Sequence, residues 1–184
     1  SSLGCQPVSF TLSGTVSNVS CNGGNDGSIN LSIGGYGTAP YTYVWSNGVT
    51  TQDISYLSSG YYNVTVTDAA GQIESSSFYI SEPSPITITY SVNSTSAAGF
   101  SDGSIWTTVS GGTAPYSFSW SGPNSYSATT QDIQNLIAGT YICNVIDANG
   151  CSELLSIVVV EGQLTSLQVN AATSDISCFG NNDG

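Results

Sequence analysis

Hydrophobic and polar residues alternate in short runs along most of the chain. This period of two appears at residues 29–33, 41–45, 62–66, 105–109, 116–120 and 141–145. It places one side of a β-strand against a core and the other toward water. Asp-Gly, Gly-Gly and Asn-Gly pairs, which favour turns, separate the runs. No run keeps the 3.6-residue period of a helix, so the pattern predicts an all-β chain.

The strand pattern is repeated within the chain. The motif NDGSI at 25–29 returns as SDGSI at 101–105, and NDG at 182–184 opens a third copy. The segments GTAPY and TTQDI also occur once in each of the first two copies. Short strands in units of about 80 residues are typical of immunoglobulin-like folds. The sequence therefore predicts tandem immunoglobulin-like β-sandwich repeats.

The segment between the two complete copies leaves the boundary open. Residues 81–85 (SEPSP) are typical of a linker, and residues 86–92 after them alternate as a strand. That strand either opens the second sandwich or folds back on the first. The expected units are the end of a preceding repeat at 1–17, a first sandwich at 18–93, a second at 94–174 and the start of a third at 175–184. Junctions at 82/83 and 162/163 are the alternative.

The cysteines bear on how the copies join. Cys21 and Cys178 precede the Asp-Gly turn of their copies, where the middle copy has Ala97. Cys151 follows an Asn-Gly turn, where the first copy has Gln72. Pairing within a copy would place Cys21 opposite Gln72 and Cys151 opposite Ala97, so neither cysteine would face another cysteine. Pairing from one copy into the next matches Cys151 with Cys178.

We therefore predict a Cys151–Cys178 disulfide across the junction. It requires the strand at about 164–171 to double back on the strand before it, because a strand running onward would carry the two sulfurs far apart. On this interpretation Cys21 bonds Cys5 or a residue outside the chain. Disulfide pairing predicts an oxidising, extracellular setting.

Charge narrows the classes of partner. Lys, Arg and His are absent from the 184 residues, and 12 carboxylates give a net charge of −12. A uniformly negative chain repels phosphate, which excludes nucleic acid and anionic membranes as direct partners. The longest apolar stretch falls far short of the roughly 20 residues of a membrane helix, so no membrane insertion is expected. General acid–base catalysis most often uses histidine, and we predict a protein that is not an enzyme.

Three aspartates are candidates for a calcium site. Asp26, Asp102 and Asp183 lie in loops rich in Asn, Gly and Ser. Ca²⁺ prefers six to eight oxygen ligands, several from carboxylates, so each loop would have to recruit a second acid. The competing interpretation is a tight turn capped by the Asp side chain. Asp53 and Asp132, which follow Thr-Thr-Gln, are expected to cap local turns, and no other cofactor is predicted.

The tryptophans divide into two kinds. Trp45 and Trp120 occupy the middle of alternating runs and are expected in the sandwich cores rather than on a sugar-stacking surface. Trp106 falls in the outward phase of its strand, where the first copy has Asn30, and is a candidate for a surface contact. Cys143 falls at an inward position and is expected to be a small buried apolar residue.

The segments at 19–29, 37–48 and 51–54 resemble the SprB-type repeat of Bacteroidetes surface proteins. The resemblance covers both complete copies and both partial ones. It implies very large, repetitive cell-surface adhesins exported through the type IX system, some of which drive gliding while others serve attachment. It implies no catalytic residues.

The expected function is therefore a stalk segment that extends a distal binding region on the cell surface. Its expected partners are the neighbouring repeats of the same chain, each packed mainly against the next. Two alternatives remain open at this point. The repeats themselves could bind surface glycans, or edge strands could join copies of the chain into a filament.

Overall fold

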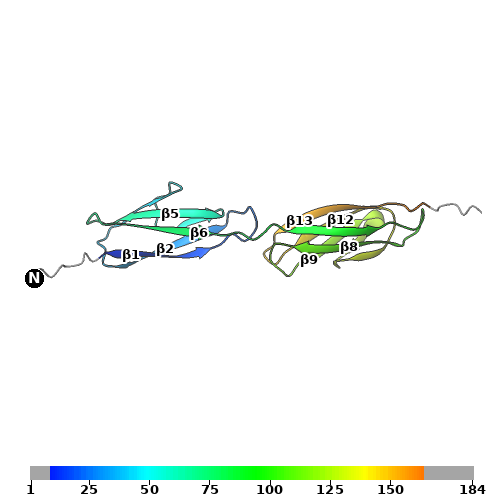
Figure 1. Ribbon diagram of the computed structural model, residues 1–184, viewed down its shortest axis with the longest axis horizontal. Helices are drawn as coiled ribbons and strands as arrows, with labels where there is room; N and C mark the ends of the chain where they lie inside the picture. The colour runs from blue at the N-terminus through cyan, green and yellow to red at the C-terminus, as the bar shows by residue number, and fades with distance from the viewer. Residues whose placement is uncertain (1–8, 164–184) are drawn as a thin grey trace, which may run out of the picture.

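The computed structural model describes residues 9–163, which form two β-sandwiches arranged end to end (Figure 1). The strands of the first are β1 (Phe10–Ser17), β2 (Gly27–Gly35), β3 (Thr42–Trp45), β4 (Ile54–Leu57), β5 (Gly60–Thr67) and β6 (Ile73–Ile80). The strands of the second are β7 (Thr87–Asn93), β8 (Gly103–Ser110), β9 (Ser117–Gly122), β10 (Tyr126–Ala128), β11 (Ile133–Leu136), β12 (Gly139–Ile146) and β13 (Ser152–Val159). Within 9–163 the only helical element is the 3₁₀ turn Pro123–Ser125, and no helix could cross a membrane.

Each sandwich consists of two facing sheets of antiparallel strands. The sheets are β1-β2-β4 and β3-β5-β6 in the first sandwich, and β11-β8-β7 and β10-β9-β12-β13 in the second. The two units share this plan except for β10, which follows the extra turn at Pro123–Ser125. The prediction of tandem immunoglobulin-like β-sandwiches is confirmed.

The alternating residues supply the cores. Trp45 and Trp120 are each 2% exposed, as expected for core residues. Their indole N–H groups donate to the backbone oxygens of Thr51 and Thr130, both at 2.9 Å, so neither polar atom is buried without a partner. Cys143 lies directly across the sheet from Trp120 and is fully buried. Burial raises the pKa of its thiol to about 11, so it packs as a neutral apolar group.

The strand after the linker opens the second sandwich. β7 pairs with β8 along its whole length, from Thr87 opposite Ser110 to Asn93 opposite Ser104. In the same way β1 pairs with β2. The expected boundaries at 17/18 and 93/94 therefore cut through sandwiches, because they separate each first strand from its hydrogen-bonded neighbour. The break lies between β6 and β7, where the alternative junction at 82/83 falls; residues 164–184 lie outside the described part.

The Thr-Thr-Gln-Asp motif caps a distant strand instead of a local turn. Asp53 Oδ1 accepts the N–H of Leu31 at 2.9 Å, and Gln52 Nε2 donates to the Leu31 oxygen at 2.6 Å. The two side chains thus hydrogen-bond the N–H and the oxygen of Leu31, a residue of β2 that lies just beyond the part of the strand paired with β4. The second sandwich repeats both bonds at Thr107, through Asp132 and Gln131. The expectation of local capping was wrong because sequence spacing does not show which strand lies beside the motif.

Candidate functional site

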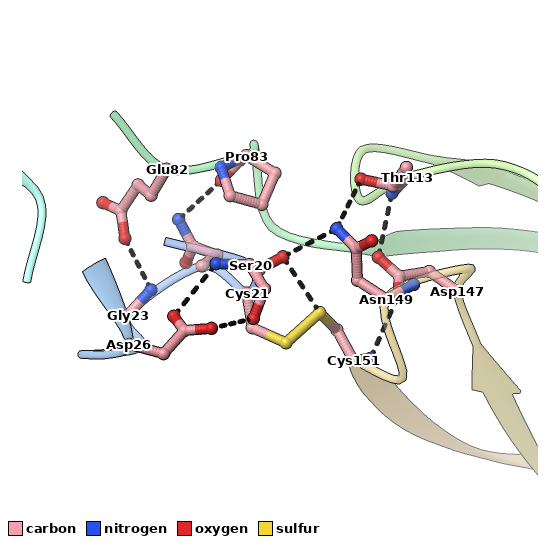
Figure 2. Close-up of a disulfide and its surroundings, with 11 residues drawn as sticks. Ser20, Cys21, Gly23, Asp26, Glu82, Pro83, Thr113, Asp147, Asn149 and Cys151 are labelled. Carbon is pink, nitrogen blue, oxygen red and sulfur yellow. Dashed lines mark hydrogen bonds between the residues drawn. A yellow bond between two sulfur atoms is a disulfide. The ribbon is translucent and has the colours of Figure 1, made fainter. Parts of the chain in front are cut away.

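A disulfide joins the two sandwiches at their junction. Cys21 follows β1 at one end of the first sandwich, and Cys151 precedes β13 at the facing end of the second (Figure 2). Their sulfurs are 2.06 Å apart and their Cα atoms 5.6 Å apart, across a sequence separation of 130 residues. The bond therefore links two independently packed cores.

The observed bond corrects the predicted Cys151–Cys178 pair. Cys151 is bonded to Cys21, so it has no sulfur valence for Cys178, which lies with Cys5 outside the described residues. The prediction required the strand after each linker to double back, but β7 runs onward into the next sandwich. The onward path brings the loop after β1 of one copy against the β12–β13 turn of the next. The bond does join successive copies, as expected. However, it links the early cysteine of one copy, Cys21, to the late cysteine of the next, Cys151, whereas the prediction linked a late cysteine to the early cysteine of the following copy.

The linker is held by the first sandwich on one side. The N–H of Gly23 donates to Glu82 Oε2 at 2.6 Å, and Asn22 Nδ2 donates to the Pro83 oxygen at 3.1 Å. Both donors belong to the loop that carries Cys21 (Figure 2). The loop therefore fixes the disulfide and the linker together.

The second sandwich holds the linker from the other side. The N–H of Gly112 donates to the Ser84 oxygen at 2.8 Å. Asn149 Nδ2 donates across the junction to the Ser20 oxygen at 3.0 Å and also contacts Thr113 Oγ1 at 3.1 Å. The junction is thus made of direct contacts and is not a free tether.

The linker passes very close to the β8–β9 turn. Gly111 has φ +74°, and a Cβ placed there would lie 2.0 Å from the Pro85 oxygen. Only glycine allows this approach, because any side chain would push the linker away. A groove of about 240 Å³ remains beside it, lined among others by the disulfide, Pro83 and Pro85.

An aspartate in the β12–β13 turn positions Cys151. Asp147 Oδ1 accepts the N–H groups of Asn149 and Cys151, both at 2.9 Å, and Oδ2 accepts the N–H of Thr113 at 2.9 Å. Burial opposes the charge of Asp147, but these hydrogen bonds outweigh it and hold its pKa below the ordinary 3.8. In the sequence, Asp147 stood out only as the first residue of an Asp-x-x-Gly segment that occurs in both copies. Nothing in that segment indicated that Asp147 positions Cys151.

The first sandwich builds the same turn around Asp68. The pKa of Asp68 is lowered below 3.8 mainly by the hydrogen bond that its carboxylate accepts from the N–H of Thr38. Burial opposes this shift, and the N–H groups of Gln72 and Ala70 add to it. The three donors lie 2.8–2.9 Å from the carboxylate. The turn geometry is therefore independent of the cysteine, because Gln72 occupies that position here.

Stability is expected to fall in acid through these two turns. A carboxyl whose pKa is lowered by folding stabilises the fold fully above its unfolded value of 3.8, and this contribution is lost as the pH falls through the lower folded value. We expect a constant melting temperature from pH 8 to about 5 and a decline below about pH 4. Calorimetry over a pH series would measure it. Asp147→Asn should flatten the acid limb, and Glu153→Gln, at an exposed carboxylate, should leave it unchanged; an identical limb in both variants would refute the assignment.

The aspartates of the candidate calcium loops act as caps in the structure. Asp26 Oδ1 accepts the N–H of Ser20 at 3.0 Å and Oδ2 its hydroxyl at 2.5 Å, and these bonds lower the pKa of Asp26. Asp102 accepts the N–H of Ser96 at 2.9 Å in the same way. In the described part of the chain, no group of three or more Cys, Asp or Glu side chains could hold a metal. Asp183 lies outside that part.

Trp106 lies on the outer face of the second sandwich. Its side chain is 43% exposed. It lines a shallow hollow of about 260 Å³ on β7 and β8, with Tyr90 and the hydroxyl residues Thr89, Ser91 and Thr108. The outward orientation expected from the alternation is present, and its role as a surface contact stays a prediction.

Comparisons with known proteins find one repeat family whose model matches both sandwiches. The SprB repeat family matches residues 13–50 and 89–125, one segment in each sandwich. Among solved structures, an amphioxus IgVJ-C2 molecule is similar at 16% identity and a TM-score of 0.35, over 83% of this chain and 96% of that one. A structure addressing Dscam isoform specificity is similar at 14% identity and a TM-score of 0.34, over 84% of this chain and 46% of that one. No curated protein matches the chain.

Proposed function

Because the chain carries two SprB repeats, which are non-enzymatic repeats of cell-surface adhesins from Bacteroidetes, we propose that it is a stalk segment. In this role it extends a distal binding region away from the cell for attachment or gliding. Its partners are the neighbouring repeats of the same chain. The observation that carries the proposal is the junction, where a disulfide and a hydrogen-bonded linker hold two sandwiches in line.

Three properties of the chain support a stalk. The sandwiches follow one another along a single axis, so each repeat adds its full length to the reach (Figure 1). The linker is bonded to both neighbours, by Gly23 on one side and Gly112 on the other, which limits bending. The charge of −12 makes neighbouring stalks repel each other at low ionic strength. An extracellular location and export through the type IX system are part of the proposal.

The stalk function can be tested by replacing the segment. In the parent protein, residues 9–163 would be exchanged for two unrelated immunoglobulin-like domains of the same overall length. We expect cells to attach at the wild-type level, because only reach is needed from this segment. Surface display would be checked with an antibody to the distal region. Loss of attachment by cells that still display that region would contradict a purely mechanical role.

A second candidate function is glycan binding at Trp106, favoured by an exposed indole beside three hydroxyl-bearing residues. An aromatic face of this kind suits a neutral sugar. If this function holds, Trp106→Ala weakens glycan binding about tenfold or more, since the loss of a buried aromatic contact is worth more than 1.4 kcal/mol. A glycan array followed by titration calorimetry measures this. Asn30→Ala, at the equivalent position of the first sandwich, is the matched control; no binding by the wild-type chain refutes the candidate.

A further inference from the structure

The disulfide creates a second covalent route through the molecule. Along the backbone, everything from β2 to β12 lies between Cys21 and Cys151. Through the sulfurs, the chain passes from the loop after β1 directly to the start of β13. Of the strands in residues 9–163, only β1 and β13 lie outside the closed loop.

The short route follows the long axis of the molecule without reversing. In Figure 1, β1 runs from the outer end of the first sandwich toward the junction, and β13 begins at the junction and ends at the far end of the second. Phe10 at the outer start of β1 pairs with Gly35, and Val159 at the far end of β13 pairs with Gly139. Both strands are already extended. The route is therefore almost straight from one end to the other.

We propose that β1, the Cys21–Cys151 disulfide and β13 form the path that transmits tension through the two sandwiches, so that tension along the stalk bypasses the rest of both folds. The existence of tension rests on the proposed stalk function. The path itself is a property of connectivity. Pulling on the two ends loads covalent bonds in series, and the hydrogen bonds from β1 to β2 and from β13 to β12 carry little of that load.

The expected consequence is a nearly inextensible unit. Each eight-residue strand spans about 27 Å in the sheet and about 29 Å when pulled straight. Unfolding either core would therefore add almost no length. Without the disulfide, the separation of 130 residues would enter the path and release about 430–470 Å.

This path also accounts for the uneven distribution of cysteines. The first sandwich has Cys21 after its first strand but Gln72 in its last turn, and the second has Cys151 in that turn but Ala97 in the loop. The Ala97 loop is built in the same way as the loop of Cys21, since the bond from Thr95 N–H to the Val160 oxygen at 3.2 Å reproduces the one from Val19 to Ser81. One disulfide is enough to complete the path through two sandwiches, because the first sandwich contributes its first strand, β1, and the second sandwich contributes its last strand, β13.

Single-molecule pulling of the full chain tests the proposal. Handle domains of known unfolding length would be fused to both ends and attached without thiol chemistry, so that the native cysteines stay as they are. We expect the oxidised wild-type chain to release a few tens of ångströms at most. The double variant Cys21→Ser/Cys151→Ser should release about 430–470 Å more, in one step for each sandwich. Cys143→Val, which places in the second core the residue found at the equivalent Val64, should behave as wild type.

Two further readouts keep the result decisive. If the double variant does not fold, the wild-type chain pulled with and without dithiothreitol gives the same comparison, and circular dichroism shows whether the reduced chain stays folded. Release of the full length by the oxidised wild-type chain would overturn the load path. Failure of the stalk function would appear instead as lost attachment after segment replacement, so the two failures are distinguishable.

Discussion

Replacing Trp45 with alanine is expected to destabilise the first sandwich by about 3–5 kcal/mol and to leave the second folded. Trp45 is 2% exposed and packs against Phe78 with ring centroids 6.1 Å apart. Its removal opens a cavity at the centre of a small core, and small domains hold only about 5–15 kcal/mol in total. The second core does not include it, so the loss should remain local. Hydrogen exchange followed by mass spectrometry would show lost protection in β1–β6 and retained protection in β7–β13.

The tandem architecture offers a mirror-image control. Trp120→Ala removes the equivalent residue of the second core and should reverse the pattern of protection. Trp106→Ala removes a half-exposed indole and should change stability by no more than about 0.5 kcal/mol. Equal loss of protection in both sandwiches after Trp45→Ala would show that the pair folds as one cooperative unit, against the independent cores described above.

The alternation of side chains determined most of what could be predicted about the fold. The inward phase identified Trp45, Trp120 and Cys143 as core residues, and the structure places all three there. The outward phase identified Trp106 as exposed. These assignments succeed because a strand presents its residues to opposite faces with a period of two, whichever strand it pairs with.

What depended on pairing between strands was not predictable in the same way. The sequence left the partner of the strand after the linker undecided, because its alternation is compatible with either sandwich. The predicted Cys151–Cys178 bond came from matching the cysteine positions of successive copies, and it required this strand to fold back on the preceding sandwich, which it does not do. Had β7 been taken as the first strand of the second sandwich, the stacking of successive copies would have brought the Cys21 loop against the Cys151 turn.

The Gln-Asp pair shows a similar limit. Residues 52 and 53 look like the cap of a turn, because Asp often accepts a nearby N–H. In the structure they bond Leu31, 21 and 22 residues away. The recurrence of the motif in the second copy showed that it mattered structurally, but it gave no information about which strand it contacts.

Removing the junction disulfide is expected to lower the summed free energy of unfolding of the two sandwiches by about 5 kcal/mol. The loop that it closes has a sequence separation of 130 residues, and closing a loop of this size removes about that much conformational entropy from the unfolded chain. The folded junction keeps its other contacts, including the bonds from Asn149 to Ser20 and from Gly112 to Ser84. The effect should therefore arise mainly in the unfolded state.

Urea titration of the oxidised wild-type chain and of Cys21→Ser/Cys151→Ser would measure this loss, with hydrogen exchange reporting each sandwich separately. Cys143→Val is the control for loss of a thiol outside the bond. We expect the midpoint of the first transition to shift most. Unfolding either sandwich alone already leaves a closed loop of about half the full length, and the entropy lost by closure grows only with the logarithm of loop length. Identical midpoints in the wild-type chain and the double variant would mean that the disulfide does not constrain the unfolded chain. Any effect of the bond would then be confined to the response of the junction to tension, where the linker and the bond from Asn149 to Ser20 also connect the two sandwiches.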